Sequence, residues 1–477
     1  MLRNKKRYTR TKKTKTPMRA GRPVVASPVE IVAAPPPQPN KIDQAFKNLL
    51  VSKLANPSEN LSKVLQVVCK DTDNCLAIGH YGVMIKSLFE DFRNLSLINV
   101  DNIRSLGNPS SNGFVLECPF HKNNYAAYTV LKSSASPTAD NLFYEYYVGT
   151  TFINKLLARF PVFVETYDCY KYKSQLKLQI TKQIAGKLTS FKASHVTDLS
   201  VMISRVIHGD LLDVTEIKKV FENSCVDSES FSILIQHFNN FMTIKELLIT
   251  KYIENEYDFP YLFYQVYFAL SVIGNKYTHY DLHAGNVCVY KPYAGNNYIL
   301  MRYHSKGKIY EFPSEYIVKI IDYGHNYVSN GATNTDRIIH DIICKTNECQ
   351  PECGVEQGYS VISTSDSLFH NIMPVAPNAS HDLRVFNELN NYKSYNFWKD
   401  KIYTGDVYYE TMYGTPEDLT GNSAKIRSIH DLRAAIEETA HPQYKDEIYA
   451  KKYATWTKVA EMDVYDDNRD YVFTQLI

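Results

Sequence analysis

One succession of segments near the middle of the chain constrains its fold more than any other feature. Residues 259–275, FPYLFYQVYFALSVIGN, place Pro260 at the start and Gly274 at the end of a pattern whose apolar residues share one helix face. This pattern predicts a buried helix. The segment that follows, HYDLHAGN at residues 279–286, is strongly polar, and the short apolar strand VCVY comes directly after it.

The polar segment is either a catalytic loop or merely a polar turn, and the next strand favours the loop. Downstream of Asn286, the apolar residues 317–321 end in Asp322-Tyr323-Gly324. A strand that delivers a carboxylate and then a flexible glycine can hold a metal ligand rigidly. Phosphoryl transfer needs this set of groups. One carboxylate orients the attacking hydroxyl and accepts its proton, while an Asn and a second Asp hold Mg²⁺ on the phosphates.

With these residues in place, the sequence resembles the protein-kinase-like superfamily. HYDLHAGN matches its catalytic loop, and DYG matches its Asp-Phe-Gly motif. The resemblance implies that Asp281 is the catalytic base and that Asn286 and Asp322 are the Mg²⁺ ligands. It also implies structural roles for His279, which braces the loop, and for Gly324.

His283 stands where protein kinases usually carry a lysine. The resemblance implies that His283 approaches the transferring γ-phosphate and belongs to the catalytic residues. Small-molecule kinases of the same superfamily often have histidine at this position, so the class of substrate stays open at this point.

The nucleotide-binding residues are implied by the strand-rich segment at residues 103–170. TVLK resembles the Val-Ala-Ile-Lys strand of kinases, which makes Lys132 the residue that reaches the α- and β-phosphates of ATP. Glu145, in the predicted helix that follows, would be its ion-pair partner. LGNPSSNGFVL stands where the glycine-rich phosphate loop belongs and contributes three further residues to the ATP site: Gly107, Gly113 and Val115.

The adenine-binding hinge is predicted at ILIQHF, where Gln236, His237 and Phe238 would lend backbone groups to the base. VMISRVIHG at residues 201–209 is the competing hinge. Farther along, Asp382 in ASHDLRVFNEL would anchor the catalytic loop from a large C-terminal helix. An ordinary helix N-cap is the alternative for Asp382.

The resemblance implies an α+β, two-lobed protein-kinase-like fold with a small β-rich N-lobe and a larger helical C-lobe. The predicted boundaries are a disordered basic and proline-rich tail at 1–40, a helical extension at 41–99, an N-lobe at 100–240 with an insertion at about 171–229, and a C-lobe at 241–477. The insertion, the DYG motif and the stretch ICKTNECQPECGVEQGY most resemble predicted serine/threonine kinases of large nucleocytoplasmic DNA viruses.

Charge is concentrated at the N-terminus. Residues 1–22 hold ten Lys or Arg and no Asp or Glu, so the rest of the chain is net acidic. The tail is either a solubilising segment or a patch that binds nucleic acid or another acidic surface, and it is compatible with nuclear import. The sequence holds no run of eighteen apolar residues and hence no predicted membrane span. Together with the resemblance, this predicts an intracellular location in host cytoplasm or virion.

Nine cysteines are scattered along the chain, which fits a reducing compartment. Cys69 and Cys75 are expected to be a reduced pair in a turn. A structural Zn²⁺ could be held by four residues that lie close together in sequence, His340, Cys344, Cys349 and Cys353. Packed free thiols are the simpler interpretation of these cysteines.

Three functions are compatible with the sequence. The first is an ATP- and Mg²⁺-dependent serine/threonine protein kinase with protein substrates. The second is a small-molecule kinase of the same fold, and the third is a catalytically weak kinase-fold protein of the virion or a scaffold. Lys132, Asp281, Asn286 and Asp322 are all present, which favours an active enzyme. The oligomeric state stays open.

Overall fold

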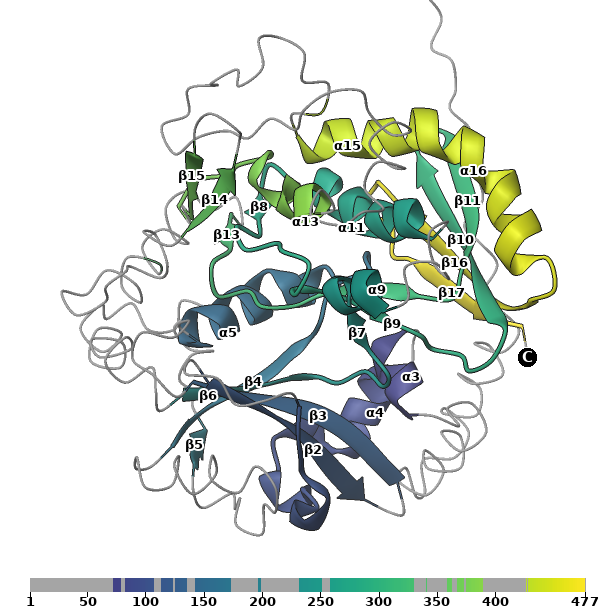
Figure 1. Cartoon of the computed structure of the whole chain (residues 1–477). Helices are drawn as coiled ribbons and strands as arrows, with labels where there is room; N and C mark the ends of the chain where they lie inside the picture. The colour runs from purple at the N-terminus through teal and green to yellow at the C-terminus, as the bar shows by residue number, and fades with distance from the viewer. Residues whose placement is uncertain are drawn as a thin grey trace, which may run out of the picture. The chain divides into compact units, whose positions relative to one another are not determined.

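The computed structural model describes residues 72–78, 82–106, 113–122, 125–134, 142–172, 196–198, 231–250, 258–329, 340, 358–362, 367–372, 375–388, 426 and 428–476. These residues form a mixed α+β structure with several separate sheets (Figure 1). The predicted tail at 1–40 lies outside the described residues. So do residues 41–71 of the predicted extension, most of the predicted insertion and the competing hinge at 201–209.

A six-stranded antiparallel sheet is formed by strands from the first half of the chain, in the order β1-β2-β3-β6-β4-β5. Its strands are β1 Arg104–Ser105, β2 Gly113–Lys122, β3 Tyr125–Ser134, β4 Thr166–Tyr172, β5 Val196–Asp198 and β6 Phe231–Gln236. Strands β1, β2 and β3 lie in the strand-rich segment predicted at residues 103–170, and β6 leads into the predicted hinge. β5, from within the predicted insertion, adds the last strand at one edge.

The segment 161–164 precedes β4, which begins at Thr166. Its backbone bonds to strand β12, Ile317–Ile320, because the Val162 carbonyl accepts the Ile320 N–H at 2.7 Å. It also bonds to side chains: the Pro161 carbonyl accepts a hydrogen bond from Lys319, and Val164 exchanges hydrogen bonds with the Tyr323 hydroxyl. These partners satisfy the backbone groups, so the pairing of β4 with β6 begins only at Thr166.

Both faces of the six-stranded sheet are buried, because successive side chains of a strand point to opposite faces. On one face, Cys169 and Ile233 belong to the hydrophobic core that includes α5. On the other face, Leu116 and Leu131 pack in a second cluster with side chains of α3, α4 and the turns that follow them. The helices of this part are α3 Thr72–Ala77, α4 Gly82–Leu88 and α5 Leu142–Thr151. The described part of the predicted extension therefore packs against one face of the sheet and shares its hydrophobic core.

The buried helix predicted near the middle of the chain is α11, which spans Phe259–Ile273. Pro260 lies in its first turn and Gly274 follows its last residue, as the sequence pattern predicted. Gln265 is buried among its apolar residues and bonds to the Tyr316 carbonyl and the Val318 N–H. α11 is thereby fixed against the strand that leads to Asp322.

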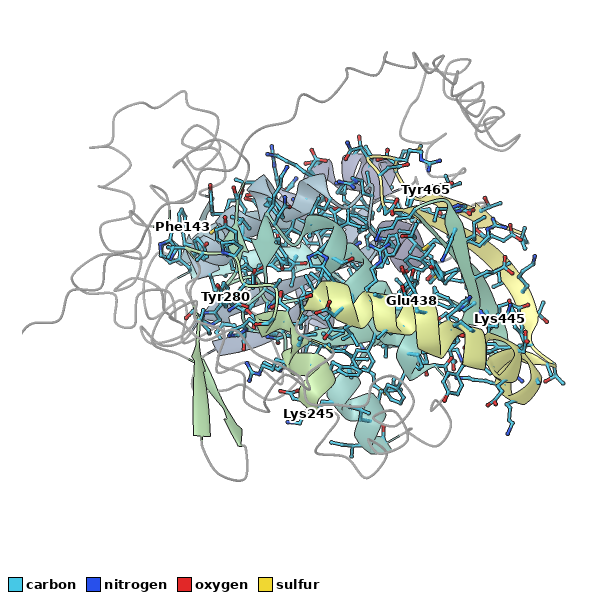
Figure 2. All side chains as sticks on the ribbon, turned by 90° about the horizontal axis from the view of Figure 1, so that it is seen from above. Phe143, Lys245, Tyr280, Glu438, Lys445 and Tyr465 are labelled. Carbon is cyan, nitrogen blue, oxygen red and sulfur yellow. The ribbon has the colours of Figure 1, made fainter. Side chains whose placement is uncertain are left out.

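The remaining elements follow β6 along the chain. The helices are α9 Ile244–Thr250, α13 Arg384–Asn387, α15 Ile429–Ala435 and α16 His441–Ile448. The strands are β7 Met242–Thr243, β8 Tyr277–Thr278, β9 Val287–Tyr290, β10 Asn297–Ser305, β11 Lys308–Ser314, β12 Ile317–Ile320, β13 Tyr327–Val328, β14 Gly358–Ile362, β15 Ser367–Asn371, β16 Thr457–Tyr465 and β17 Val472–Gln475. Figure 2 shows Glu438 and Lys445 on the outer side of the helical stretch around α15 and α16.

The part predicted as a helical C-lobe contains more sheet than expected. Strands β11, β10, β16 and β17 form a four-stranded sheet in which β10 pairs in parallel with β16 from near the C-terminus. The hairpin β10–β11 lies in sequence between β9 and β12, which pair with each other in a separate sheet. The pairing of β10 with β16 joins strands far apart in sequence, which the local pattern of neither strand reveals.

Cys75 takes part in a disulfide whose other half lies outside the described residues. The expectation of a reduced pair at Cys69 and Cys75 is therefore wrong for Cys75. Cys118, Cys169 and Cys288 are free and buried.

Candidate active site

Lys132 is the centre of the candidate site. β3 carries it between two strands, with Val115 of β2 on one side and Ile233 of β6 on the other. Its Nζ lies 2.8 Å from Glu145 Oε2 and 2.8 Å from Asp322 Oδ1. The structure thus brings together three of the residues predicted to bind ATP and metal, although Asp322 lies 190 residues from Lys132 in sequence.

Glu145 lies in α5 and its side chain is only 2% exposed. A carboxylate that is buried this deeply is costly unless a cation and hydrogen bonds compensate it. Lys132 is that cation. The pair therefore fixes α5 against β3 and holds the lysine where it also meets Asp322.

Asp322 follows directly on the strand β12 and has a left-handed backbone conformation with φ of +72°. Residues other than glycine rarely adopt this conformation, and such strain collects at functional sites. Ile321 fixes the chain immediately before the turn, because its N–H donates to the Asn286 carbonyl at 3.1 Å. Its carbonyl lies 3.0 Å from His279 Nε2. The end of β12 is thus tied to the predicted catalytic loop at two points.

The predicted catalytic loop places Asp281 and Asn286 in contact. Asn286 Nδ2 donates to the Asp281 carbonyl at 3.0 Å and to Asp281 Oδ2 at 3.2 Å. The other carboxylate oxygen, Oδ1, accepts a hydrogen bond from Arg384 Nη1 at 2.7 Å. Two donors from two different segments therefore fix the orientation of the Asp281 carboxylate.

The contacts of His283 lie within its own loop. Its Nδ1 accepts a hydrogen bond from the Gly285 N–H at 3.0 Å, while its Nε2 lies 3.7 Å from Asp281 Oδ2. A Cβ at position 285 would come within 2.8 Å of the His283 ring, so a larger residue there would displace the ring. His283 is thus packed onto the backbone of its own loop.

Asp382 is buried beneath the loop and accepts hydrogen bonds from two successive backbone N–H groups, those of His279 at 2.8 Å and Tyr280 at 3.0 Å. Burial raises the pKa of the Asp382 carboxyl to about 7, although the two N–H donors favour its charged form. Tyr280, labelled in Figure 2, has a φ of +63°. Asp382 therefore stabilises a strained turn, and it does so from a short 3₁₀ turn, residues 381–383, that leads directly into α13.

His279 is completely buried, and burial lowers the pKa of its imidazole to about 4. Its carbonyl accepts a hydrogen bond from Asn326 Nδ2 at 2.7 Å, and the Asn326 Oδ1 accepts one from Tyr277. The Asn326 carbonyl accepts a hydrogen bond from the hydroxyl of Tyr144 in α5. This chain of bonds links α5, the loop and the segment after Asp322.

Several of these residues were missed at the level of sequence. Arg384 and Asn326 have no flanking motif. The Tyr323 hydroxyl bonds to Val164 and Ile320, which gives the tyrosine of DYG a partner that phenylalanine would not have. Lys319 was detectable in principle, because a lysine inside the apolar strand Ile317–Ile320 must find partners when buried.

Lys319 is 1% exposed, and burial lowers the pKa of its ammonium group to about 7. Its Nζ donates to the carbonyls of Ala77 at 3.0 Å and Pro161 at 2.6 Å. Lys319 thereby connects β12 with α3 and with the segment that precedes β4.

The predicted hinge lies at the end of β6. The Gln236 amide donates to the Leu76 carbonyl and accepts from the Glu165 N–H at 3.2 Å. His237 Nε2 lies 3.0 Å from Glu117 Oε2, and Phe238 is buried. The hinge residues are thus held by α3 and β2, while their use by a nucleotide stays a prediction.

The glycine-rich loop is described only in part. Gly107 lies outside the described residues, and Gly113 begins β2. A Cβ at position 113 would come within 2.3 Å of the Ser133 carbonyl oxygen, so the close approach of β2 to β3 requires glycine. Gly324 is buried directly after Tyr323.

The proposed zinc ligands are placed only at His340, whose ring packs edge-on against Tyr144 at 5.4 Å. Cys344, Cys349 and Cys353 lie outside the described residues, so the zinc site stays a prediction. In the described part of the chain, no three His, Cys, Asp or Glu side chains cluster as a metal site. None of the helices described here combines the length and hydrophobicity that a bilayer crossing requires.

No protein-family model matches the sequence, and no curated protein matches it. The interpretation of the site therefore rests on its geometry. Two clusters lie side by side: an ammonium group between two carboxylates, and a carboxylate fixed by an amide and a guanidinium. Ile321 connects them through its bonds to Asn286 and His279.

Proposed function

We propose that this chain is an ATP-dependent phosphotransferase of the protein-kinase-like superfamily, and that it phosphorylates serine or threonine hydroxyls of proteins. The observation that carries the proposal is the position of Lys132, whose Nζ lies 2.8 Å from both Glu145 and Asp322. In this proposal the six-stranded sheet and α5 are the nucleotide lobe. The part built on α11 is the second lobe of a two-lobed fold.

The proposed reaction follows from the two clusters. Lys132 binds the α- and β-phosphates of ATP, and the Asp281 carboxylate accepts the proton of the attacking hydroxyl. A bond forms between the hydroxyl oxygen and the γ-phosphorus, while the bond between that phosphorus and the β–γ bridging oxygen breaks. ADP leaves with the bridging oxygen and its electron pair, and the acceptor carries the phosphoryl group.

Asn286 and Asp322 fit the requirements of a Mg²⁺ site. The Nδ2 of Asn286 donates hydrogen bonds to Asp281, so the Oδ1 of Asn286 is the oxygen that would bind a cation. Asp322 uses Oδ1 toward Lys132, and its Oδ2 is a second oxygen of the type that Mg²⁺ prefers. Mg²⁺ bound there would neutralise charge on the phosphates.

A transfer assay tests the proposal. Purified protein, radiolabelled ATP and Mg²⁺ are incubated with casein, with a serine/threonine peptide library, and separately with choline or kanamycin. Label on casein or the peptides, absent in Lys132→Met, supports the proposal. Label only on the small alcohols would select the small-molecule kinase instead. No transfer to any acceptor, and no hydrolysis of ATP, would favour the scaffold protein.

A further inference from the structure

α13 and the residue that follows it each contact the predicted catalytic loop. Arg384 Nη1 donates to Asp281 Oδ1 at 2.7 Å, and Glu388 Oε2 accepts the Ala284 N–H at 2.7 Å. The two residues also approach each other, because Arg384 Nε lies 3.5 Å from Glu388 Oε1. The guanidinium is therefore held between a carboxylate next to the helix and the carboxylate of the loop.

The position of Arg384 matters because phosphoryl transfer gains from a cation close to the reacting oxygens. His283 is the residue of the loop that would be assigned this role. In the structure its Nδ1 accepts the Gly285 N–H at 3.0 Å, so this nitrogen is already used by the backbone of the loop. Its Nε2, at 3.7 Å, is too far from Asp281 Oδ2 for a normal hydrogen bond.

We propose that Arg384, and not His283, supplies the fixed positive charge next to Asp281 and positions its carboxylate for the attacking hydroxyl. This inference rests on the proposed function. The guanidinium is permanently charged and presents its donors in a rigid plane, so it orients a carboxylate better than an ammonium group does. Asn286 holds the second oxygen, and Asp281 is thereby fixed from both sides. His283 then acts as a brace of the loop.

The test compares variants of full-length protein with casein as the acceptor. Arg384→Ala should lower kcat by about a hundred- to a thousandfold, the range for one lost stabilising donor. KM for ATP should not change, because Lys132 and Asp322 still bind the nucleotide. Arg384→Lys should restore part of kcat. Guanidinium ion added to Arg384→Ala should raise its kcat without raising that of the parent, which a purely structural defect would not allow.

Two control variants sharpen the result. Arg302 has similar exposure and also bonds to a carboxylate, Asp463 at 2.7 Å, but it lies on β10. Arg302→Ala should keep the parent kcat and show no guanidinium rescue. His283→Asn keeps an oxygen that can accept the Gly285 N–H but cannot become a cation, and it should keep kcat within about tenfold of the parent.

The outcomes separate the two proposals. If the parent transfers phosphate to no acceptor and does not hydrolyse ATP, the proposed function fails. If the parent is active while Arg384→Ala keeps the parent kcat, or changes only KM for ATP, the role of Arg384 is overturned and the proposed function stands. A His283→Asn defect as large as that of Arg384→Ala would also overturn it. Arg384→Gln, which preserves length and a donor amide, replaces the alanine variant if that variant does not fold.

Discussion

Two lysines in this protein each lie between two carboxylates, and their surroundings differ. Lys132 meets Glu145 and Asp322, while Lys452 meets Glu315 at 2.6 Å and also Asp258. The charge pattern is the same. Nevertheless, the side chain of Lys132 is 22% exposed and that of Lys452 is 11% exposed. Each cluster has one acid at 2%, Glu145 and Asp258, but the second acid is 21% exposed in Asp322 and only 6% in Glu315.

The cluster around Lys452 is enclosed by further protein groups. The Tyr453 hydroxyl donates to Asp258 at 2.7 Å, Lys291 bonds to Glu315, and the Trp456 ring lies 5.6 Å from the Lys452 ammonium. Each charge there is neutralised and shielded inside the fold. A lysine between two acids is therefore not by itself evidence of a functional site. Greater exposure and the left-handed backbone of Asp322 distinguish the Lys132 cluster and support the role proposed for it.

The largest effect that separates the two regions is expected for Asp281→Asn. The amide cannot accept the hydroxyl proton, so turnover should fall by about two to four orders of magnitude while the folded structure is kept. Asp463→Asn is the matched control, because Asp463 also bonds to an arginine at 2.7 Å. Transfer assays and thermal unfolding of both variants check this. Equal turnover in the two variants would remove Asp281 from the mechanism.

Lys452→Met should have the opposite effect. It leaves the buried Asp258 and Glu315 without their common cation, which should lower the free energy of unfolding by about 3–5 kcal/mol. Turnover per folded molecule should match the parent. Lys458→Met is the control, since the exposed pair of Lys458 with Glu461 should contribute less than about 1 kcal/mol. Denaturant unfolding measures both. A stable but inactive Lys452→Met would contradict the distinction between the regions.

The pH dependence of stability gives a smaller effect. Burial raises the pKa of Asp258 to about 6, so between pH 4 and 6 the folded protein retains a proton that the unfolded chain has released. Stability should therefore fall as the pH rises through this window, by up to about 3 kcal/mol from this one group. Asp258→Asn has no carboxyl group to titrate, so this contribution to the change of stability with pH should vanish. Parallel unfolding curves for parent and variant across the window would refute the assignment.

Tyr323→Phe should have the smallest effect. The variant removes the hydroxyl that bonds to the Val164 N–H at 2.8 Å and leaves that buried group without its partner. A loss of about 1–3 kcal/mol in the free energy of unfolding is expected, with turnover close to that of the parent. Unfolding and transfer assays run side by side measure the two effects. A large loss of turnover at unchanged stability would mean that the hydroxyl takes part in the chemistry.

The local parts of the fold were predictable from the sequence. α11 shows the apolar face, the early proline and the following glycine of a buried helix, and β3, β6 and β9 are short apolar strands between polar turns. The polar loop and Asp322 were identified because each follows directly on such an element. Their neighbours along the chain therefore determine where their side chains lie.

The long-range parts were not predictable. Arg384 lies 103 residues from Asp281 in sequence, and nothing around it distinguishes it from a surface arginine. The parallel pairing of β10 with β16 and the burial of α3 and α4 against the six-stranded sheet depend on tertiary packing. Lys319 is the exception. A charged residue within an apolar strand was a visible signal of buried partners.

A measurement of nucleotide binding is the most direct test of the proposal that Lys132, Glu145 and Asp322 form an ATP site. Calorimetric titration of ATP into the parent, with and without Mg²⁺, should give binding that Mg²⁺ strengthens. Asp322→Ala should unfold at a temperature close to that of the parent and lose the Mg²⁺-dependent part of the binding. If Asp322→Ala binds ATP and Mg²⁺ as the parent does, or if the parent binds no ATP at all, the assignment of this site is wrong.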